Sequence, residues 1–348
     1  MPDSMTRVTQ RSHMTALVCT LLCAGIPAGH CENLPPKVAP EATVWKSASI
    51  FEKDSNDEFE KKPRMNLSGA ACVPTTPKFT SCLIANDEKK YAQFFSIEGN
   101  LLVPKDLIRL SDDDGDPDAE GAAYDEGFFY VTGSHGRSRH GDKKNLSSYN
   151  VFRIAVDPKT GVPKTKPDAE NVDGVEASSR LRKVLKNDDD VEAYFNEPLA
   201  DGGINIEGTA VKNGRMYFGL RGPSVKRRAY VVSVNADALF TRDGDLKPKT
   251  RSIELGKNTG IRDLAAVSDG LLILAGPTRD EDVPYTVWLW DGTSETAKPL
   301  ATLDLSKVKD GAKAEILLPL EEDASSIHVL VMFDGVENGG AISFKIKR

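Results

Sequence analysis

Three segments of the chain repeat one eight-residue pattern: Glu120-Gly-Ala-Ala-Tyr-Asp-Glu-Gly127, Glu207-Gly-Thr-Ala-Val-Lys-Asn-Gly214 and Asp263-Leu-Ala-Ala-Val-Ser-Asp-Gly270. Each copy begins with an acid, has Ala at its fourth position and ends with Gly, and an apolar run follows the Gly. A short strand, a tight turn whose Gly can adopt positive φ, and a buried second strand together form a β-hairpin. The pattern therefore predicts three copies of one hairpin.

Two looser copies extend the series, one from Ser68-Gly-Ala-Ala71 and one from Glu315. The five starts, at residues 68, 120, 207, 263 and 315, lie 52, 87, 56 and 52 residues apart. Four short strands in a unit of about 40–50 residues are typical of a β-propeller blade. The sequence predicts an all-β chain that folds as a β-propeller with five recognisable blades, and it leaves a sixth blade open.

The intervals between the copies predict the domain organisation. Apolar residues at helical spacing, from Val175 through Leu181 to Leu185, predict a helical insertion at about residues 174–204 in place of a sixth blade. The last unit is one strand short. We expect Ala42–Phe51, within an N-terminal tether of residues 32–66, to supply that strand and to close the ring by pairing N- and C-terminal strands. The propeller domain then covers residues 67–348.

The N-terminus has the pattern of an export signal. Arg7 and Arg11 precede an uncharged, mostly apolar run from Met14 to Ile26, and small residues follow at Ala28 and Gly29. The run is shorter than the roughly 20 apolar residues of a spanning helix. We interpret residues 1–31 as a signal peptide, cleaved after Ala28 or Cys31, with a membrane anchor or a helix of the folded domain as alternatives.

The net charge and the hydropathy of the chain argue against two kinds of partner, nucleic acid and a membrane. The 45 Lys and Arg against 52 Asp and Glu give 45 − 52 = −7, and this acidic balance argues against a protein that binds nucleic-acid backbones. No other segment is long and apolar enough to cross a bilayer, so we expect no membrane span in the mature chain. The expected location is periplasmic or secreted.

Cysteine usage fits an exported protein. Of the five cysteines, Cys72 and Cys82 lie beyond the predicted signal, on either side of a segment that contains Pro74 and Pro77. That segment reads as a turn between two strands, and a cross-strand disulfide is expected in an oxidising compartment. Two buried thiols are the alternative, and a zinc site is not expected because no His or further Cys is near.

Three ordered pairs of motifs resemble a known family. They are Asp118-Ala-Glu-Gly-Ala-Ala123 with Thr132-Gly-Ser-His-Gly-Arg137, Asn205-Ile-Glu-Gly208 with Gly219-Leu-Arg-Gly-Pro223, and Gly260-Ile-Arg-Asp263 with Ala275-Gly-Pro277. The chain resembles the domain of unknown function 3616 from about residue 68 to residue 344, although the last blade has Glu315-Ile where Glu-Gly fits the pattern better. The resemblance implies a β-propeller and no particular reaction. More distantly, the chain is similar to six-bladed propellers with phytase-like esterase, lactonase or phosphotriesterase activities.

The repeated acids are candidate metal ligands. In a propeller the first strand of each blade lines the central channel, so residues at equivalent positions converge. Glu120, Glu207, Asp263 and Glu315 are predicted to form a ring of carboxylates, and such a ring suits Ca²⁺, which accepts six to eight oxygen ligands. The alternative is structural: each acid caps the backbone of its own or of the neighbouring blade.

Basic residues differ between the blades. Ser134, His135 and Arg137 follow the second strand of one unit, Arg221 follows that of the next, and Arg262 precedes Asp263. One His with several Arg residues at one mouth of the channel suits an anionic ligand, because guanidinium groups bind phosphate or carboxylate. The alternative pairs each Arg with a channel carboxylate.

Two functions remain in view. The first is an exported propeller that binds a small anionic ligand or a protein partner at the channel mouth, through Ser134, Arg137, Arg221 and Arg262. The second is a Ca²⁺-dependent hydrolase of phosphoesters, lactones or related esters, with His135 as the catalytic base.

Overall fold

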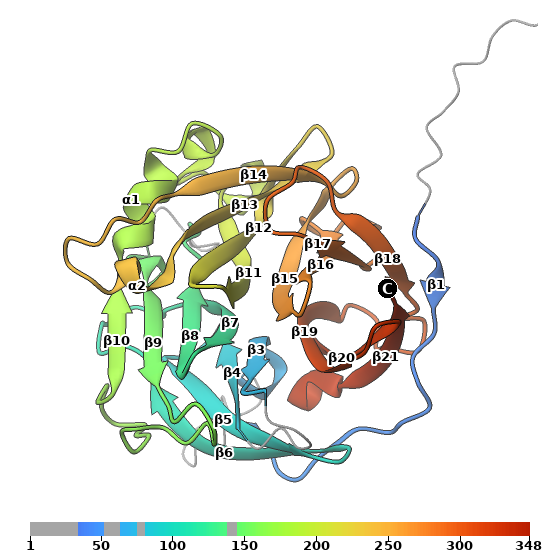
Figure 1. Ribbon diagram of the computed structural model, residues 1–348, viewed down its shortest axis with the longest axis horizontal. Coiled ribbons are helices and arrows are strands. Elements are labelled where there is room, and N and C mark those ends of the chain that lie inside the picture. The colour runs from blue at the N-terminus through green and yellow to red at the C-terminus, as the bar shows by residue number, and fades with distance from the viewer. Residues whose placement is uncertain (1–33, 52–62, 75–80, 138–144) are drawn as a thin grey trace, which may run out of the picture. The chain divides into compact units, whose positions relative to one another are not determined.

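Five β-sheets stand around a common axis in the computed structural model of the chain, as in a propeller (Figure 1). The structure describes residues 34–51, 63–74, 81–137 and 145–348. Residues 34–348 form one compact unit. The predicted signal peptide and its cleavage positions lie outside the described residues.

The first two blades each run from an innermost strand to an outer strand in chain order. Blade one contains β3 (Leu67–Cys72), β4 (Cys82–Asn86), β5 (Tyr91–Glu98) and β6 (Leu101–Arg109). Blade two contains β7 (Ala119–Asp125), β8 (Phe128–Gly133), β9 (Val151–Ala155) and β10 (Val175–Ser178). The helical turn η2 (Ser147–Tyr149) lies between β8 and β9.

The remaining blades follow the same order. Blade three contains β11 (Asn205–Lys212), β12 (Arg215–Val225), β13 (Arg228–Asn235) and β14 (Lys249–Glu254), with helix α2 (Ala236–Leu239) before β14. Blade four contains β15 (Thr259–Val267), β16 (Gly270–Pro277), β17 (Thr286–Trp290) and β18 (Lys298–Leu303). Blade five contains β19 (Lys313–Glu322), β20 (Ser326–Asp334) and β21 (Ile342–Lys347), with η5 (Glu337–Gly340) before β21. The predicted five-bladed, all-β architecture is confirmed.

The repeated glycines form the predicted turns in two blades. Glu126 and Gly127 have φ values of 41° and 89°, and Asn213 and Gly214 have values of 53° and 71°. Two consecutive positive φ values define the hairpin turn that matches the twist of the flanking strands. In blade four the turn falls on residues 268–269 instead, because Val267 pairs with Gly270.

The core is divided among the gaps between blades. The described residues form five buried apolar clusters, and each cluster combines side chains of two neighbouring blades. Phe94 of blade one and Phe129 of blade two, for example, pack edge to face with ring centroids 5.9 Å apart. Since each sheet buries one face against the blade before it and the other against the blade after it, the ring has no exposed sheet face to protect.

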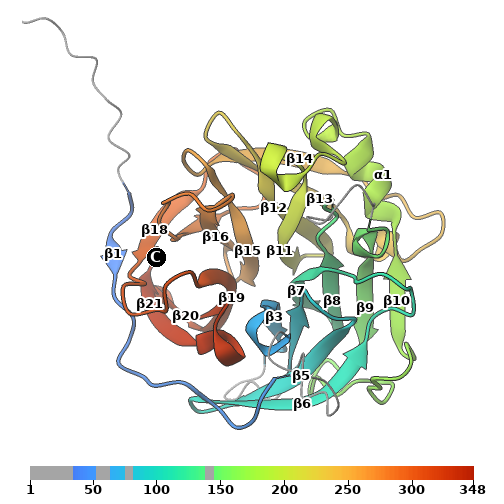
Figure 2. The same ribbon diagram turned by 180° about the vertical axis from the view of Figure 1, so that it is seen from behind.

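The N-terminal segment closes the ring in a different way from the expected one. β1 (Lys37–Val38) pairs in parallel with β18 of blade four, and β2 (Lys46–Ser47) pairs in parallel with β6 of blade one. Between them, the Glu41 N–H donates to the Ser343 carbonyl of blade five at 2.8 Å. The segment thus runs as a strap around the outside of three blades (Figure 2), and the expected fourth strand of blade five is not formed from residues 42–51.

The path of the strap is set by Phe51, whose side chain packs between blades five and one. Phe51 is fully buried in the cluster shared by blades five and one, where it packs against Phe95 with centroids 5.7 Å apart. Its N–H donates to the Asn338 side chain of blade five at 3.0 Å. A segment that places Phe51 there must cross the boundary between the blades and cannot follow the edge of one.

Helices follow β10, as predicted, but the helical insertion begins later than the expected residue 174. Residues 175–178 form β10, and then come α1 (Arg180–Lys186), η3 (Glu192–Tyr194) and η4 (Leu199–Asp201). Leu181 and Leu185 of α1 are fully buried in the cluster between blades two and three. In the part of the chain that the structure describes, every helix is too short or too polar to cross a membrane.

We expect Phe51→Ala to lower the free energy of unfolding by about 3 kcal/mol, because the truncation leaves a cavity at the blade boundary. Val44→Ala on the same strap is the control, since Val44 is 65% exposed. The control is expected to change the free energy by less than about 0.5 kcal/mol. Chemical denaturation of both variants measures the difference, and equal stabilities would contradict the role assigned to the strap.

Candidate functional site

Every innermost strand carries one extra residue relative to its neighbour in the blade. The extra residue, a β-bulge, lies near the start of the strand, at Gly69, Glu120, Glu207, Arg262 and Glu315. We call this end of the ring the bulge end, and we call the opposite end, where the innermost hairpins turn, the hairpin end. A bulge redirects the side chain of the extra residue, and charged side chains occupy four of these five positions.

In blade four the bulge lies one residue before the acid with which the repeat was aligned. The aligned repeat matched Asp263 with Glu120 and Glu207. The strand pairing instead places Arg262 at the equivalent position, because Ile261 pairs with Ala275 and Asp263 with Leu274. The turn of blade four is displaced by the same one residue, since residues 268–269 follow Arg262 by the same interval as residues 126–127 follow Glu120. An arginine therefore stands where two other blades have a glutamate.

A chain of ion pairs joins three blades through the bulge residues. Glu207 accepts a hydrogen bond from Arg221 Nη1 at 2.8 Å, and its other oxygen lies 2.9 Å from Arg262 Nε. Arg262 Nη2 in turn contacts Glu315 of blade five. Arg221 also donates through Nε to the Thr278 carbonyl at 2.8 Å. The side chains of Glu207, Arg221 and Arg262 are at most 4% exposed, so this network is buried.

Burial and pairing act against one another on these groups. Burial opposes the charged guanidinium of Arg262, but the carboxylates of Glu207 and Glu315 outweigh it and raise the pKa of Arg262. Burial raises the pKa of Glu315 to about 7, although Arg262 lowers it. Arg262 therefore stays charged near neutral pH, and Glu315 is the member of the pair whose pKa lies in that range.

Asp263 has a structural role. One of its oxygens accepts the Leu264 N–H at 2.7 Å, and the other accepts the Leu317 N–H of blade five at 2.7 Å. Both oxygens are thus occupied by backbone donors, one in its own strand and one in the next blade. This is the capping alternative that the repeat left open.

Glu120 lies apart from the ion pairs. One of its carboxylate oxygens accepts the Ser68 hydroxyl of blade one at 2.9 Å, and the same hydroxyl lies 2.9 Å from the Glu120 carbonyl. Burial raises the pKa of Glu120, and the nearby charges of Asp118 and Glu207 raise it further. Glu120 is therefore in a field of other carboxylates.

Further acids gather near Glu120 at the bulge end. Burial raises the pKa of Asp87, and so do Glu315 and Asp118. Burial also raises the pKa of Asp116 to about 6. Sequence reasoning missed Asp87, although a signal existed. In blade one Ser68 precedes the bulge and pairs with Ala85, and Asp87 lies two residues after Ala85. His135 has the equivalent position in blade two, two residues after Gly133.

The glycine in blade one lets its strand approach its neighbour. Gly69 has φ 66°, and a Cβ built there would lie 2.6 Å from the Gly121 Cα of blade two. A side chain at this bulge would therefore force β3 away from β7. Blade one contributes the Ser68 hydroxyl to the site instead of a charge.

His135 is a buried, neutral imidazole. It is 1% exposed, and its Nδ1 lies 2.9 Å from the Gly133 carbonyl. Burial lowers the pKa of His135 to about 4. Ser134 beside it is fully buried, and its hydroxyl accepts the Gly136 N–H at 3.1 Å. Arg137 is partly exposed and donates to the Asn196 carbonyl at 3.5 Å.

The structure thus divides the candidate residues into separate groups. Arg221 and Arg262 lie with Glu207 and Glu315 in the ion-pair network. Ser134, His135 and Arg137 lie at the blade two–three boundary, where Arg137 contacts Asn196 of the helical insertion and His135 contacts Tyr149. Among the described residues, no three His, Cys, Asp or Glu side chains are placed to hold a metal ion.

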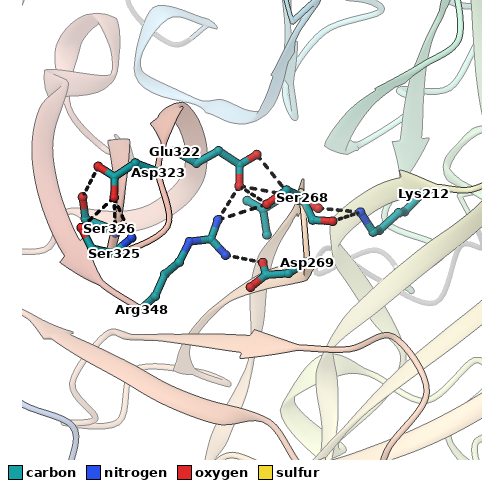
Figure 3. Close-up of polar contacts among 9 residues, drawn as sticks. Lys212, Ser268, Asp269, Glu322, Asp323, Ser325, Ser326 and Arg348 are labelled. Atoms are coloured by element: carbon teal, nitrogen blue, oxygen red, sulfur yellow. Dashed lines mark hydrogen bonds and ion pairs between the residues drawn. The ribbon is translucent and has the colours of Figure 1, made fainter.

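The hairpin end is held by contacts of its own. Cys72 and Cys82 form a disulfide between facing positions of β3 and β4. Across blades three to five, Arg348 contacts Asp269 and Glu322, and Glu322 accepts the Ser268 hydroxyl at 2.8 Å (Figure 3). Lys212 donates to the Val267 carbonyl at 2.6 Å. These groups satisfy one another and form a second network that joins neighbouring blades.

An open cavity of about 410 Å³ lies away from the channel, beside β6 of blade one. The strap, a bulge in β6 and the loop before β10 line it, and its lining includes Ile50, Gln93 and Lys105. None of the candidate residues contributes to it.

The family of the chain can be stated from its sequence. Residues 81–156 and 153–340 match the family model described as "Protein of unknown function (DUF3616)". The matches span most of the chain, which therefore belongs to this family. No curated protein matches the chain in sequence.

Several solved structures are similar in fold. A GH43 β-1,3-galactosidase, solved with galactodeoxynojirimycin, is 10% identical with a TM-score of 0.48, over 88% of this chain and 94% of that chain. An exo-β-1,3-galactanase from Phanerochaete chrysosporium is 8% identical with a TM-score of 0.45, over 86% and 63%. The calcium-binding protein regucalcin from Agrobacterium tumefaciens is 12% identical with a TM-score of 0.36, over 88% and 97%. Each of these three likenesses has a TM-score below 0.5.

We expect Arg262→Met to destabilise the fold by about 3–5 kcal/mol, because it leaves the buried carboxylates of Glu207 and Glu315 without their shared cation. Arg227→Met is the matched control. Arg227 pairs with Glu254 on the surface, where an ion pair is worth at most about 1 kcal/mol. Denaturant titration separates the two, and a loss for Arg262→Met no larger than that for the control would contradict the network.

The raised pKa of Glu315 predicts a pH dependence. The folded state holds the proton up to a pH of about 7, and the unfolded state loses it near 4.5. The stability that this proton provides is complete below pH 4.5 and is lost as the pH rises through 7. Between pH 5 and pH 8 the free energy of unfolding should fall by about 2–3 kcal/mol more in the natural protein than in Glu315→Gln. Parallel pH profiles of the two proteins would contradict the assignment.

Proposed function

We propose that this member of the DUF3616 family is an exported binding module, and that its bulge end receives a cationic group of a protein partner. The observation that carries the proposal is the environment of Glu120, a buried carboxylate surrounded by other carboxylates. Such a group favours either a proton or an incoming positive charge.

The charges along the channel support a binding module in preference to an active site. Arg221 and Arg262 are already paired with Glu207 and Glu315. A pocket that binds an anion needs cations that are not already neutralised. The predicted small anionic ligand therefore has little support at these two arginines, and the sign of the expected partner is reversed.

The field at the bulge end supports a cationic partner. The pKa values of Glu120, Asp87 and Asp116 are raised, in each case first by burial and then by further acids. Several carboxylates that raise one another's pKa values produce a negative potential, which attracts a lysine or arginine side chain. A protein partner with an exposed basic segment offers that group.

The Ca²⁺-dependent hydrolase fits these residues less well. Both Asp263 oxygens accept backbone N–H groups, and both Glu207 oxygens contact arginines. Two of the four predicted ligands are thus committed elsewhere. His135, the predicted base, stacks on Tyr149 beside the helical insertion and is no part of the ion-pair network of Glu207, Arg262 and Glu315.

Export is supported by two independent features. The N-terminus has the basic start and apolar run of a signal peptide. Cys72 and Cys82 form a disulfide, and disulfides persist in oxidising compartments. A periplasmic or secreted location is therefore part of the proposal.

The test is binding of a ten-residue lysine peptide, measured by fluorescence anisotropy at low ionic strength. The double variant Asp87→Asn, Glu120→Gln should raise the dissociation constant about tenfold, which is about 1.4 kcal/mol. The double variant Glu98→Gln, Glu126→Gln is the matched control, because it also removes two carboxylates, both of them exposed and at the hairpin end. The control is expected to change the constant less than twofold.

Two results would overturn the proposal. Equal losses in the double variant and the control would show that the peptide responds only to net charge. A rise in the melting temperature with Ca²⁺, reversed by chelator and absent in Glu120→Gln, would favour the metal-dependent alternative.

A further inference from the structure

The helical insertion is linked to a buried histidine of blade two through one aromatic ring, that of Tyr149. His135 stacks edge to face on Tyr149, with ring centroids 5.9 Å apart. From the insertion, Phe195 packs on Tyr149 at 5.8 Å, and the Asn196 side chain accepts the Tyr149 hydroxyl at 3.3 Å. Tyr149, stacked on His135, is therefore the aromatic floor on which residues 187–201 rest.

The hydrogen bonding of His135 defines its charge state in this contact. A carbonyl oxygen can only accept, so the Nδ1 that faces the Gly133 carbonyl carries the proton. Nε2 is then an acceptor. It is buried and has no hydrogen-bond partner among the residues that the structure describes. A second proton on Nε2 would place a charged, unpaired donor in a dry contact.

The charges that face His135 are positive. Arg182 of α1 lies 4.8 Å from the centre of the Tyr149 ring, and its charge lowers the pKa of His135. Burial raises the pKa of Tyr149, and the charges of Arg182 and Arg137 oppose that rise. An imidazolium at His135 would be repelled by Arg182, on top of the loss of hydration.

The first turn of the insertion is fixed independently of this contact. Arg180 donates to the carbonyls of Thr241 at 2.6 Å and Gly244 at 2.7 Å, beyond helix α2. The segment after α1 is held at its far end, where Arg279 donates to the Ala200 carbonyl at 2.6 Å. These contacts hold the two ends of the insertion, so the residues between Arg180 and Ala200 can leave Tyr149 while both anchors stay in place.

We propose that His135 is an acid-sensitive latch: when its buried Nε2 takes up a proton, residues 187–201 leave Tyr149 and expose the aromatic floor beneath them. The device is separate from the bulge-end site, because it involves none of the carboxylates there. In an exported protein it would couple the acidity of the surroundings to the surface that blades two and three present.

The size of the response follows from linkage. Burial lowers the pKa of His135 to about 4 in the docked state, and a solvent-exposed imidazole titrates near 6.5. Docking is then favoured fully above pH 6.5 and is weakened as the pH falls toward 4. The opening equilibrium should shift about a hundredfold between pH 7 and pH 4.

Hydrogen exchange followed by mass spectrometry tests the latch, with protection factors corrected for the intrinsic pH dependence of exchange. Protection of residues 187–201 should fall about a hundredfold from pH 7 to pH 4, while β8 and β12 stay protected. In His135→Asn the fall should be less than threefold, since asparagine tolerates the positive φ of 52° and keeps a donor for the Gly133 carbonyl.

His328→Asn is the matched control. His328 lies on the surface of β20, near Glu41, and this variant should respond to pH as the natural protein does. Equal protection at both pH values, or an unchanged loss in His135→Asn, would overturn the proposal. If His135→Asn does not fold, an NMR titration of the His135 ring in the natural protein decides the matter. A midpoint different from that of the loss of protection would refute the latch.

Discussion

One extra residue in each innermost strand sets the constraint that shapes this propeller. The bulge brings one side chain of each blade into contact with those of its neighbours, in a part of the ring that water does not reach. A charge buried there must find a partner in the next blade. Arg262 forms ion pairs with Glu207 and Glu315 of the two neighbouring blades, and Glu120 accepts a hydrogen bond from the Ser68 hydroxyl.

The same constraint explains why the blades keep a fixed register. The cores between blades are apolar and would tolerate small displacements, since hydrophobic contact is not directional. Ion pairs and hydrogen bonds are directional, and the Arg262–Glu207 and Arg262–Glu315 pairs and the Leu317–Asp263 bond each join one blade to the next. The polar interior thus specifies how the blades fit, while the apolar clusters provide most of the driving force.

A channel filled by its own charges leaves the ends of the ring for binding. The hairpin end is held by a disulfide and by the Arg348 network, whose charges are matched. The bulge end keeps an excess of carboxylates beside Glu120, and the helical insertion covers its blade two–three side. The functional differences within this family of propellers are therefore best sought in the loops and acids at the bulge end.

The sequence alone predicted the all-β propeller and five recognisable blades in their order, and it left a sixth blade open. A repeat of strand, tight turn and strand at regular intervals buries both faces of each sheet when the copies form a ring. Glu120, Glu207 and Glu315 were also visible, because an acid recurs at the start of four of the five copies. Three features were not visible in the sequence. They are the path of the strap, the start of the insertion at residue 180 and the partners of the charged residues.

Those features depended on the tertiary structure for a physical reason. A bulge shifts the register of one strand by one residue without any mark in the sequence, so Arg262 and not Asp263 came to stand beside Glu207. Whether a carboxylate binds a metal, a guanidinium or a backbone N–H depends on which donor lies within about 3 Å, and residues far apart along the chain set that distance.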